Sequence, residues 1–232
     1  MDFYLRTELR EATTKDLDSL TNIQMAAFPD DPQWNYRFPR REQYPGDTET
    51  YTKLRFESFL NDDRYRVVLA EICRTEDGKT MWPVAFAVWE DRQRAPMAVA
   101  PSTDSDQRRR DANRLHMKVF RETLTNARKR LFDDHRFRYI QLLILGTHPD
   151  HRKQGLGSLL CEQGMDLAKD KNAYVSVFGS PMGKKLYASL GFRELETIEV
   201  RASGEEQTLS ISAMIYQGLD EAKALISEPH HI

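Results

Sequence analysis

The chain contains little of what a disulfide-stabilised or metal-binding protein requires. Its 232 residues include only two cysteines, Cys73 and Cys161. Two cysteines so far apart form neither a disulfide framework nor the paired spacing of a zinc site. We therefore expect both thiols to be buried and reduced, and we expect no metal ion.

Long apolar runs are also missing. No run approaches the about 18 residues that a membrane-spanning helix needs. The N-terminal residues lack the apolar core of a signal peptide. We therefore expect a soluble, cytoplasmic protein, with the nucleus as the alternative.

Neither sign of charge is in marked excess. The 34 Lys and Arg residues nearly balance the 36 Asp and Glu residues, for a formal net charge of −2. This balance argues against a globally basic nucleic-acid-binding protein. Two local basic runs, 108–110 and 128–130, are the exception. A solvated loop and a solvated helix face are their ordinary explanation, and contact with nucleic acid is the alternative.

What the chain does contain is an alternation of strand and helix patterns. Long hairpins and one strand–helix–strand crossover follow one another, which predicts an α/β (α+β) fold with a mixed sheet and helices on both faces. The predicted helices are 13–28, 48–60, 114–132, 155–169, 182–189 and 220–226. The predicted strands are 5–12, 65–73, 82–90, 139–147, 173–178, 192–201 and 207–216.

Two segments break this alternation. Residues 29–47 carry four prolines among four aromatic residues, which predicts an irregular aromatic loop. Residues 91–111 are polar and rich in Asp and Arg, and we interpret them as a mobile insertion rather than a linker between domains. With 40% hydrophobic residues, the chain can bury one sizeable core, so we predict a single domain over 1–232.

The most informative motif follows the predicted strand at 139–147. A turn at 148–150 leads into Arg152-Lys153-Gln154-Gly155-Leu156-Gly157, and a helix pattern begins there. A strand, a glycine-containing turn and a helix together direct backbone N–H groups at a phosphate. The motif therefore predicts a binding site for a phosphorylated ligand.

Three kinds of glycine turn partly or fully resemble this motif. A Walker loop needs a lysine before its Ser or Thr, and Ser158 follows Gly157 instead. A dinucleotide-binding turn needs a third glycine where this chain has Leu160. The acyltransferase pyrophosphate turn, Gln/Arg-x-x-Gly-x-Gly/Ala, is matched at every fixed position by residues 152–157. A basic loop before an ordinary helix remains the simpler alternative.

With Ser180, Tyr187 and the pair Gly191-Phe192 downstream, the chain resembles the GNAT superfamily of acetyl-CoA-dependent N-acetyltransferases, including uncharacterised fungal members. Residues 9–28 are similar to the opening strand and helix of that family. The resemblance implies a mixed, mostly antiparallel, twisted sheet of about seven strands with helices on both faces. It also implies acetyl-CoA as the co-substrate.

The resemblance implies a role for each matching residue. Backbone groups of 145–147 would contact the pantetheine arm, residues 152–158 would hold the pyrophosphate, and Tyr187 would be the general acid toward the departing thiolate. The residues implied to bind acetyl-CoA are Leu145, Gly146, Thr147, Arg152, Lys153, Gln154, Gly155, Leu156, Gly157, Ser158, Ser180 and Tyr187.

Elementary acid–base chemistry refines the expected role of Tyr187. A thiol has a pKa near about 8.5 and a free tyrosine near about 10, so complete proton transfer to the thiolate is uphill. We therefore expect Tyr187 chiefly to stabilise the thiolate by a hydrogen bond.

The amine that attacks the thioester must also lose a proton, which requires a base. Glu90 is our candidate base, and Asp91, Asp30 and Asp31 are alternatives. His148 and His151 flank the turn without an evident third ligand, so we do not assign them to a metal site.

These observations predict an N-acetyltransferase that transfers an acetyl group to a primary amine by direct attack on the thioester. The acceptor is expected to be a small-molecule amine, with a protein N-terminus or lysine as the alternative, and the aromatic loop is the candidate acceptor wall. We expect a monomer or a homodimer. A non-catalytic acyl-CoA-binding regulatory module, or a nucleic-acid-associated protein using its arginine runs, is the alternative function.

Overall fold

The computed structural model describes residues 6–73, 80–92, 108–133 and 138–217. Most of the connection between the predicted strands 65–73 and 82–90, with the Asp77-Gly78 pair that favours a hairpin turn, lies outside these ranges. Most of the predicted insertion and the predicted helix 220–226 lie outside them as well. Within them, every helix is too short or too polar to cross a bilayer.

One continuous sheet of seven strands, in the order β1-β2-β3-β4-β5-β7-β6, forms the centre of the molecule. All neighbouring strands are antiparallel except β4 and β5, which are parallel. The mixed, mostly antiparallel sheet predicted from the resemblance is therefore confirmed. The strands are β1 (Thr7–Glu11), β2 (Tyr65–Cys73), β3 (Met81–Asp91), β4 (Tyr139–Thr147), β5 (Tyr174–Gly179), β6 (Arg193–Val200) and β7 (Leu209–Tyr216).

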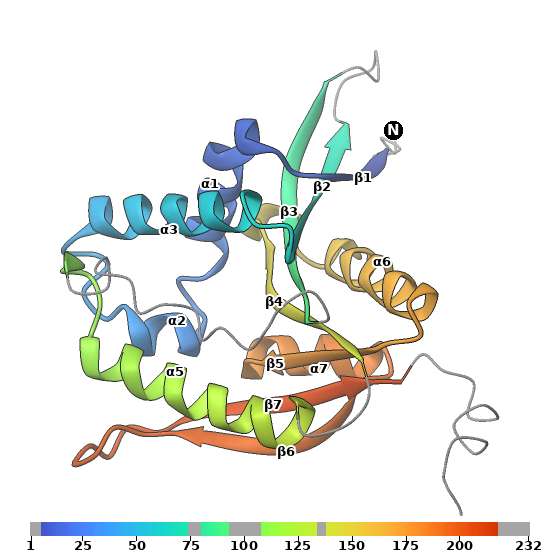
Figure 1. Cartoon of the computed structure of the whole chain (residues 1–232). Coiled ribbons are helices and arrows are strands. Elements are labelled where there is room, and N and C mark those ends of the chain that lie inside the picture. Colours follow the sequence, from blue (N-terminus) through green and yellow to red (C-terminus); the bar gives the residue numbers. More distant parts are fainter. Residues whose placement is uncertain (1–5, 74–79, 93–107, 134–137, 218–232) are drawn as a thin grey trace, which may run out of the picture.

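Helices cover both faces of this sheet (Figure 1). The α-helices are α1 (Leu17–Ala27), α2 (Pro32–Arg37), α3 (Pro45–Leu60), α5 (Arg114–Arg128), α6 (Leu156–Asp170) and α7 (Pro181–Ser189). Short helical turns at η1 (Thr14–Asp16), η2 (Lys129–Asp133) and η3 (Pro149–His151) adjoin them.

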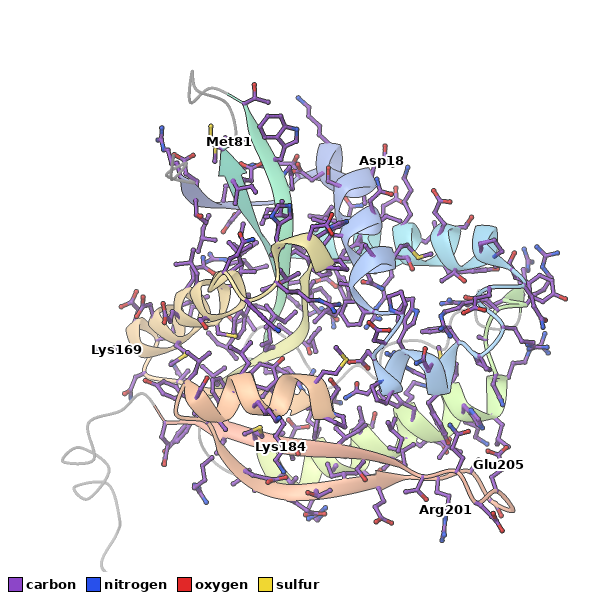
Figure 2. All side chains as sticks on the ribbon, turned by 180° about the vertical axis from the view of Figure 1, so that it is seen from behind. Asp18, Met81, Lys169, Lys184, Arg201 and Glu205 are labelled. Atoms are coloured by element: carbon purple, nitrogen blue, oxygen red, sulfur yellow. The ribbon has the colours of Figure 1, made fainter. Side chains whose placement is uncertain are left out.

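Alternating side chains of the strands divide the core between the two faces. On β3, Phe86 and Val88 pack beneath α1 and α3, whereas Ala87 and Trp89 pack beneath α6. Farther along the sheet, α5 packs on the face of β6 and β7 that α7 leaves uncovered. Figure 2 shows Lys184 on α7, and Arg201 and Glu205 at the far end of the β6–β7 hairpin.

The prediction that 29–47 is irregular throughout was wrong, because the segment contains α2. The Asp31 carboxylate accepts hydrogen bonds from the N–H groups of Gln33 (2.8 Å) and Trp34 (3.3 Å) and so caps this helix. Pro32 occupies its first turn, where the missing N–H has no cost. The capping signal was present in the sequence, but the density of prolines obscured it.

The start of the next helix also differs from the prediction. Helix α3 begins at Pro45 rather than after Thr48, because Pro45 is preorganised for a first helical turn. The Thr48 hydroxyl lies inside the helix, 3.0 Å from the Asp111 carboxylate. Thr48, the residue at which the helix was predicted to begin, is therefore not its cap. Its hydroxyl group instead joins α3 to the segment before α5.

Strands β4 and β5 separate partway along their length. Their parallel pairing covers only residues 139–142 of β4 and 174–177 of β5. On its other edge, β4 has a register shift against β3 between Val88 and Trp89. The following residues of β4, 143–147, thus have no partner on β5, and their backbone groups are open on that side.

Candidate active site

A cavity of about 580 Å³ lies where β4 and β5 separate. Its walls come from α1, α2, α3, α5, the second half of β4, the turn before α6, and α7. Nearly all of the residues predicted to bind acetyl-CoA lie along it: Leu145, Gly146, Thr147, Arg152, Lys153, Gly155, Leu156, Gly157, Ser158, Ser180 and Tyr187. Segments far apart in the sequence are thus brought together in one site.

One end of the cavity is formed by the N-terminus of α6. Gly155 is the N-cap residue and has a φ of +80°, a left-handed conformation that favours glycine. It supplies no capping side chain, so the N–H groups of the first turn, 156–158, are available to a ligand. These groups and the helix dipole together make an anion-binding site.

The second glycine of the motif has a different role from the first. A Cβ at Gly157 would lie 3.2 Å from Cδ2 of Leu186, so this position keeps α6 close to α7. At Gly155 a Cβ would meet nothing within 4 Å, and backbone conformation is the constraint there. The motif therefore combines one conformational requirement with one packing requirement.

The basic residues of the turn differ in their surroundings. Nη2 of Arg152 donates a hydrogen bond to the Ala27 carbonyl oxygen at 2.7 Å, which joins the turn to the end of α1. Lys153 lines the cavity with a positive φ of 60°. Gln154 is exposed, outside the cavity lining, and its side-chain nitrogen lies 3.5 Å from the Asp150 carbonyl oxygen. The structure thus brings Arg152 and Lys153 to the site and leaves Gln154 outside it.

Tyr187 lies on α7 and reaches the same cavity. Only 6% of its surface is exposed, and its ring packs near Phe192 at a centroid distance of 5.7 Å. Burial, followed by the nearby Cys161 and Asp31, raises the pKa of Tyr187 above its ordinary value. The hydroxyl therefore stays protonated at neutral pH and is suited to donating a hydrogen bond.

Ser180 is the N-cap residue of α7. Its hydroxyl oxygen accepts a hydrogen bond from the N–H of Gly183 at 3.4 Å, while the residue also lines the cavity. Its position matches the prediction, and its observed contact is with the helix that carries Tyr187.

Glu90 is not brought to the cavity. Its carboxylate lies 2.9 Å from Nη1 of Arg92, and only 5% of the residue is exposed. Burial raises the pKa of Glu90 and nearby arginines, Arg92 first, oppose that rise. In the register of the sheet Glu90 faces Gln141 at the paired end of β4, away from the open end at 146–147.

Among the residues that the structure describes, Asp31 is the carboxylate that lines the cavity. Only 8% of the residue is exposed, and its negative charge contributes to the raised pKa of Tyr187. One carboxylate oxygen, Oδ1, caps α2. The neighbouring Asp30 has a side chain that is 79% exposed and does not line the cavity. The structure therefore distinguishes Asp31, which lines the cavity, from Asp30, which does not, whereas the sequence could not distinguish them.

The aromatic residues of the segment 28–44 divide between two environments. Phe28 and Trp34 line the cavity. Tyr36 stacks instead on His116 at 4.0 Å, and Phe38 packs against Trp34. Two of these aromatic residues are thus placed to contact a substrate, together with Phe120 and Phe178 from elsewhere in the chain.

Two arginines of the cavity were missed in the sequence. Arg37 is the last residue of α2, and Arg55 lies on α3. Arg37 belongs to a helix that was not predicted, and Arg55 is one of several arginines with no distinguishing local pattern. No signal in the sequence marks either as a cavity residue, because their meeting depends on how α2 and α3 pack.

Of the remaining candidates, His151 lines the cavity, and the others lie outside its lining. Cys161 is fully buried, and burial raises the pKa of its thiol to about 12. His148 and His151 are 6.0 Å apart between ring centroids, and no cluster of three metal-ligating residues occurs among the described residues. In the arginine runs, Arg109, Arg110 and Arg130 pair with Asp111, Asp47 and Glu196 of the same chain.

Comparisons with known proteins agree with this arrangement. Residues 124–194 match the model of the acetyltransferase (GNAT) domain. The chain is 24% identical over 216 residues, 91% of each chain, to a protein described as acetyltransferase from the fungus Stachybotrys chartarum.

Solved structures share the fold at low identity. A polyamine N-acetyltransferase from Drosophila melanogaster has a TM-score of 0.62 and 15% identity, over 91% of this chain and 100% of that one. NAA60 from Arabidopsis thaliana, solved in complex with acetyl-CoA, has a TM-score of 0.53 and 14% identity, over 91% and 98%.

Proposed function

We propose that the chain is a GNAT acetyltransferase, as its match to the GNAT domain model and its fungal relative support, and that it transfers an acetyl group from acetyl-CoA to a primary amine by direct attack of the amine on the thioester. The observation that carries the proposal is the shared cavity of the α6 N-terminus and Tyr187. An anion-binding site and a protonated hydroxyl group thus line one enclosed space.

The residues present fit acetyl-CoA. The uncapped N–H groups of 156–158, with Arg152 and Lys153 beside them, would hold the pyrophosphate. The open backbone groups of β4 at 145–147 would hold the pantetheine arm. Acetyl-CoA supplies the activated acetyl group as a thioester when it is bound.

Asp31 is the residue we assign to the acceptor amine. An ammonium group near pKa 10.4 must lose its proton before its nitrogen attacks, at a cost of about 4 to 5 kcal/mol at pH 7. The Asp31 carboxylate attracts the ammonium group and receives the proton through a water molecule. Its place in the cavity lining supports this assignment over Glu90.

Tyr187 acts on the leaving group. As the nitrogen–carbon bond forms and the carbon–sulfur bond breaks, negative charge collects on the sulfur. The Tyr187 hydroxyl donates a hydrogen bond to that sulfur, and proton transfer follows late because the raised tyrosine pKa opposes it.

Direct transfer fits the placement of the cysteines. Cys161 does not line the cavity, and its thiol is protonated at neutral pH. Cys73 is buried on β2. The acceleration then comes largely from holding two substrates in the correct orientation.

A panel of amines tests the proposed function. The full-length protein is incubated with acetyl-CoA and polyamines, arylalkylamines, amino acids or peptides with a free N-terminus or lysine. Released thiol and acetylated product are measured. We expect amine-dependent thiol release with at least one class. Acetyl-CoA binding without thiol release for any amine would instead support a non-catalytic acyl-CoA-binding module.

A further inference from the structure

Arg37 lines the cavity, and its guanidinium group has no carboxylate partner among the described residues. Its Nε donates a hydrogen bond to the Gln33 carbonyl oxygen at 3.0 Å, and its guanidinium carbon lies 4.4 Å from the centroid of the Phe120 ring. Among the described residues, the Arg37 side chain contacts Gln33, Phe38 and Phe120 and forms an ion pair with no carboxylate. A half-buried charge with so few partners is costly unless a ligand pairs with it.

The charges around Arg37 make that cost larger. Burial, then repulsion from Arg55, lowers the pKa of Arg37 to about 9, and Arg109 contributes in the same direction. Asp31 opposes the shift, but its Oδ1 is already bonded to the N–H groups at the start of α2. At neutral pH Arg37 remains charged, and its surroundings favour an anion.

These two arginines are separate from the basic residues expected to hold the cofactor. Arg152 and Lys153 belong to the turn before α6, whereas Arg37 and Arg55 come from two other elements, α2 and α3 (Figure 1). The pyrophosphate site therefore does not account for them. We therefore expect the anion that pairs with Arg37 to belong to the other substrate.

We infer that Arg37 binds a carboxylate on the acceptor, so that the acceptor is an amine that also carries a carboxylate. This inference rests on the proposed function. The planar guanidinium suits a carboxylate because it offers two parallel N–H donors. Asp31 supplies the opposite charge for the amine, and Trp34 and Phe120 supply apolar walls. The cavity thus complements an amino acid with an apolar side chain.

Matched acceptors that differ in one group test this inference. The probes are L-phenylalanine, its neutral amide and 2-phenylethylamine, each compared at an equal concentration of deprotonated amine. Because an unpaired buried charge penalises the wrong substrate, we expect kcat/KM for L-phenylalanine to exceed that of the other two by about ten- to hundredfold.

Variants of Arg37 test whether its side chain causes the preference for an acceptor that carries a carboxylate. Arg37→Met keeps the length that packs on Phe120 but removes the charge, and Arg37→Lys keeps the charge. We expect Arg37→Met to abolish the preference for the carboxylate and Arg37→Lys to retain part of it. Arg41→Met is the matched control, because Arg41 lies just after α2 and outside the cavity lining. It should leave the preference unchanged.

Binding without turnover gives a second readout. Trp34 lines the cavity, so its fluorescence reports occupancy, with Trp34→Phe as the control for the signal. We expect 3-phenylpropionate, which has no amine, to bind the wild type and to bind Arg37→Met at least about tenfold more weakly.

The inference and the proposed function fail in different ways. Acetylation of amines without a preference for a carboxylate overturns the inference and leaves the function standing. An Arg37→Met variant that weakens all acceptors equally shows that Arg37 only supports the wall through Phe120. Lack of acetylation with any amine overturns the function. In that case 3-phenylpropionate binding still decides whether Arg37 is a carboxylate site.

Discussion

The ring of Tyr187 lies directly against Gly183, one turn earlier on α7. A Cβ at position 183 would lie 2.8 Å from Cε2 of Tyr187 and 3.3 Å from its hydroxyl oxygen. The backbone at 183 is thus part of the surface that positions the tyrosine hydroxyl. This contact makes the orientation of the proposed hydrogen-bond donor testable without changing the donor itself.

Gly183→Ala should lower kcat although alanine normally favours a helix. Alanine is about 1 kcal/mol better than glycine in a helix interior, but here its methyl group must displace the Tyr187 ring. We expect at least about a tenfold loss of kcat, since a displacement near 1 Å can cost about a hundredfold. Gly46→Ala in α3 is the control, because a Cβ there meets nothing within 4 Å. Equal kcat in both variants would contradict the positioning role.

Tyr187→Phe should reduce turnover far more than cofactor affinity. Loss of the hydroxyl removes one hydrogen bond to the departing sulfur, which is expected to cost about a hundred- to thousandfold in kcat. The affinity for acetyl-CoA, measured by calorimetry, should change by less than about threefold, because most phosphate contacts come from α6. Unchanged thiol release would disprove the assigned role.

The pH profile provides a further check on the same side chain. The pKa of Tyr187 is raised above its ordinary value, so its neutral form persists as the pH rises. The rate of acetyl transfer should therefore not fall between pH 8 and about 10 through loss of the tyrosine proton. A descending limb in this range that disappears in Tyr187→Phe would contradict the raised pKa.

Gly155→Ala should weaken acetyl-CoA binding specifically. Gly155 has a φ of +80° and Gly204 a φ of +83°, and a Cβ at either position meets nothing within 4 Å. Both substitutions should therefore lower the free energy of unfolding by about 1 to 2 kcal/mol, the cost of a left-handed alanine. Gly204 lies in the β6–β7 turn, away from the cavity. Only Gly155→Ala should raise the Kd for acetyl-CoA, and equal Kd values would remove Gly155 from the phosphate site.

Asp31→Asn should distinguish the effect of the Asp31 charge on catalysis from its role as the N-cap of α2. Asparagine caps a helix as well as aspartate does, so α2 should persist in the circular dichroism spectrum. Loss of the carboxylate should lower kcat/KM for the amine by about a hundredfold or more, with the Kd for acetyl-CoA unchanged. Asp30→Asn is the adjacent control, because its side chain is 79% exposed. Similar activities of the two variants would refute Asp31 as the base.

An ion pair far from the cavity should control stability at acid pH. Arg10 donates hydrogen bonds to Asp16 at 2.7 and 2.9 Å and lowers the pKa of that carboxyl from 3.8 to about 2. The stabilisation, about 2 kcal/mol, is present above pH 4 and is lost as the pH falls toward 2. Asp16→Asn should show this deficit in urea unfolding at pH 7, and the difference from wild type should narrow at pH 3.

The control for this ion pair is Asp18→Asn. The Asp18 side chain is 80% exposed and, among the described residues, pairs with Lys53 at the surface, so its loss should cost less than about 1 kcal/mol. If the two variants have equal stability at every pH, the Arg10–Asp16 pair contributes nothing beyond an ordinary surface charge.

Much of the fold followed from local patterns. Strands β2 and β4 have the predicted bounds, 65–73 and 139–147, because apolar and β-branched residues filled them between clear turns. The cofactor turn was equally local, since a left-handed glycine, a basic pair and a helix start are adjacent in the chain. Helix α2 was missed because its capping aspartate lies among prolines that also favour irregular loops.

The sequence by itself determined the strands, the helices other than α2, the glycine turn and Tyr187, all of which depend on neighbours along the chain. Only the tertiary structure decided which groups face the acceptor. Glu90 and Asp31 are equivalent as isolated carboxylates, but β4 pairs with β5 at the end beside Glu90 and separates from it at the other end. The cavity opens at that separation, and the packing of α2 and α3 brings Asp31, Arg37 and Arg55 to it. Contacts of this kind depend on the register of strands and the packing of helices, which no short stretch of sequence specifies.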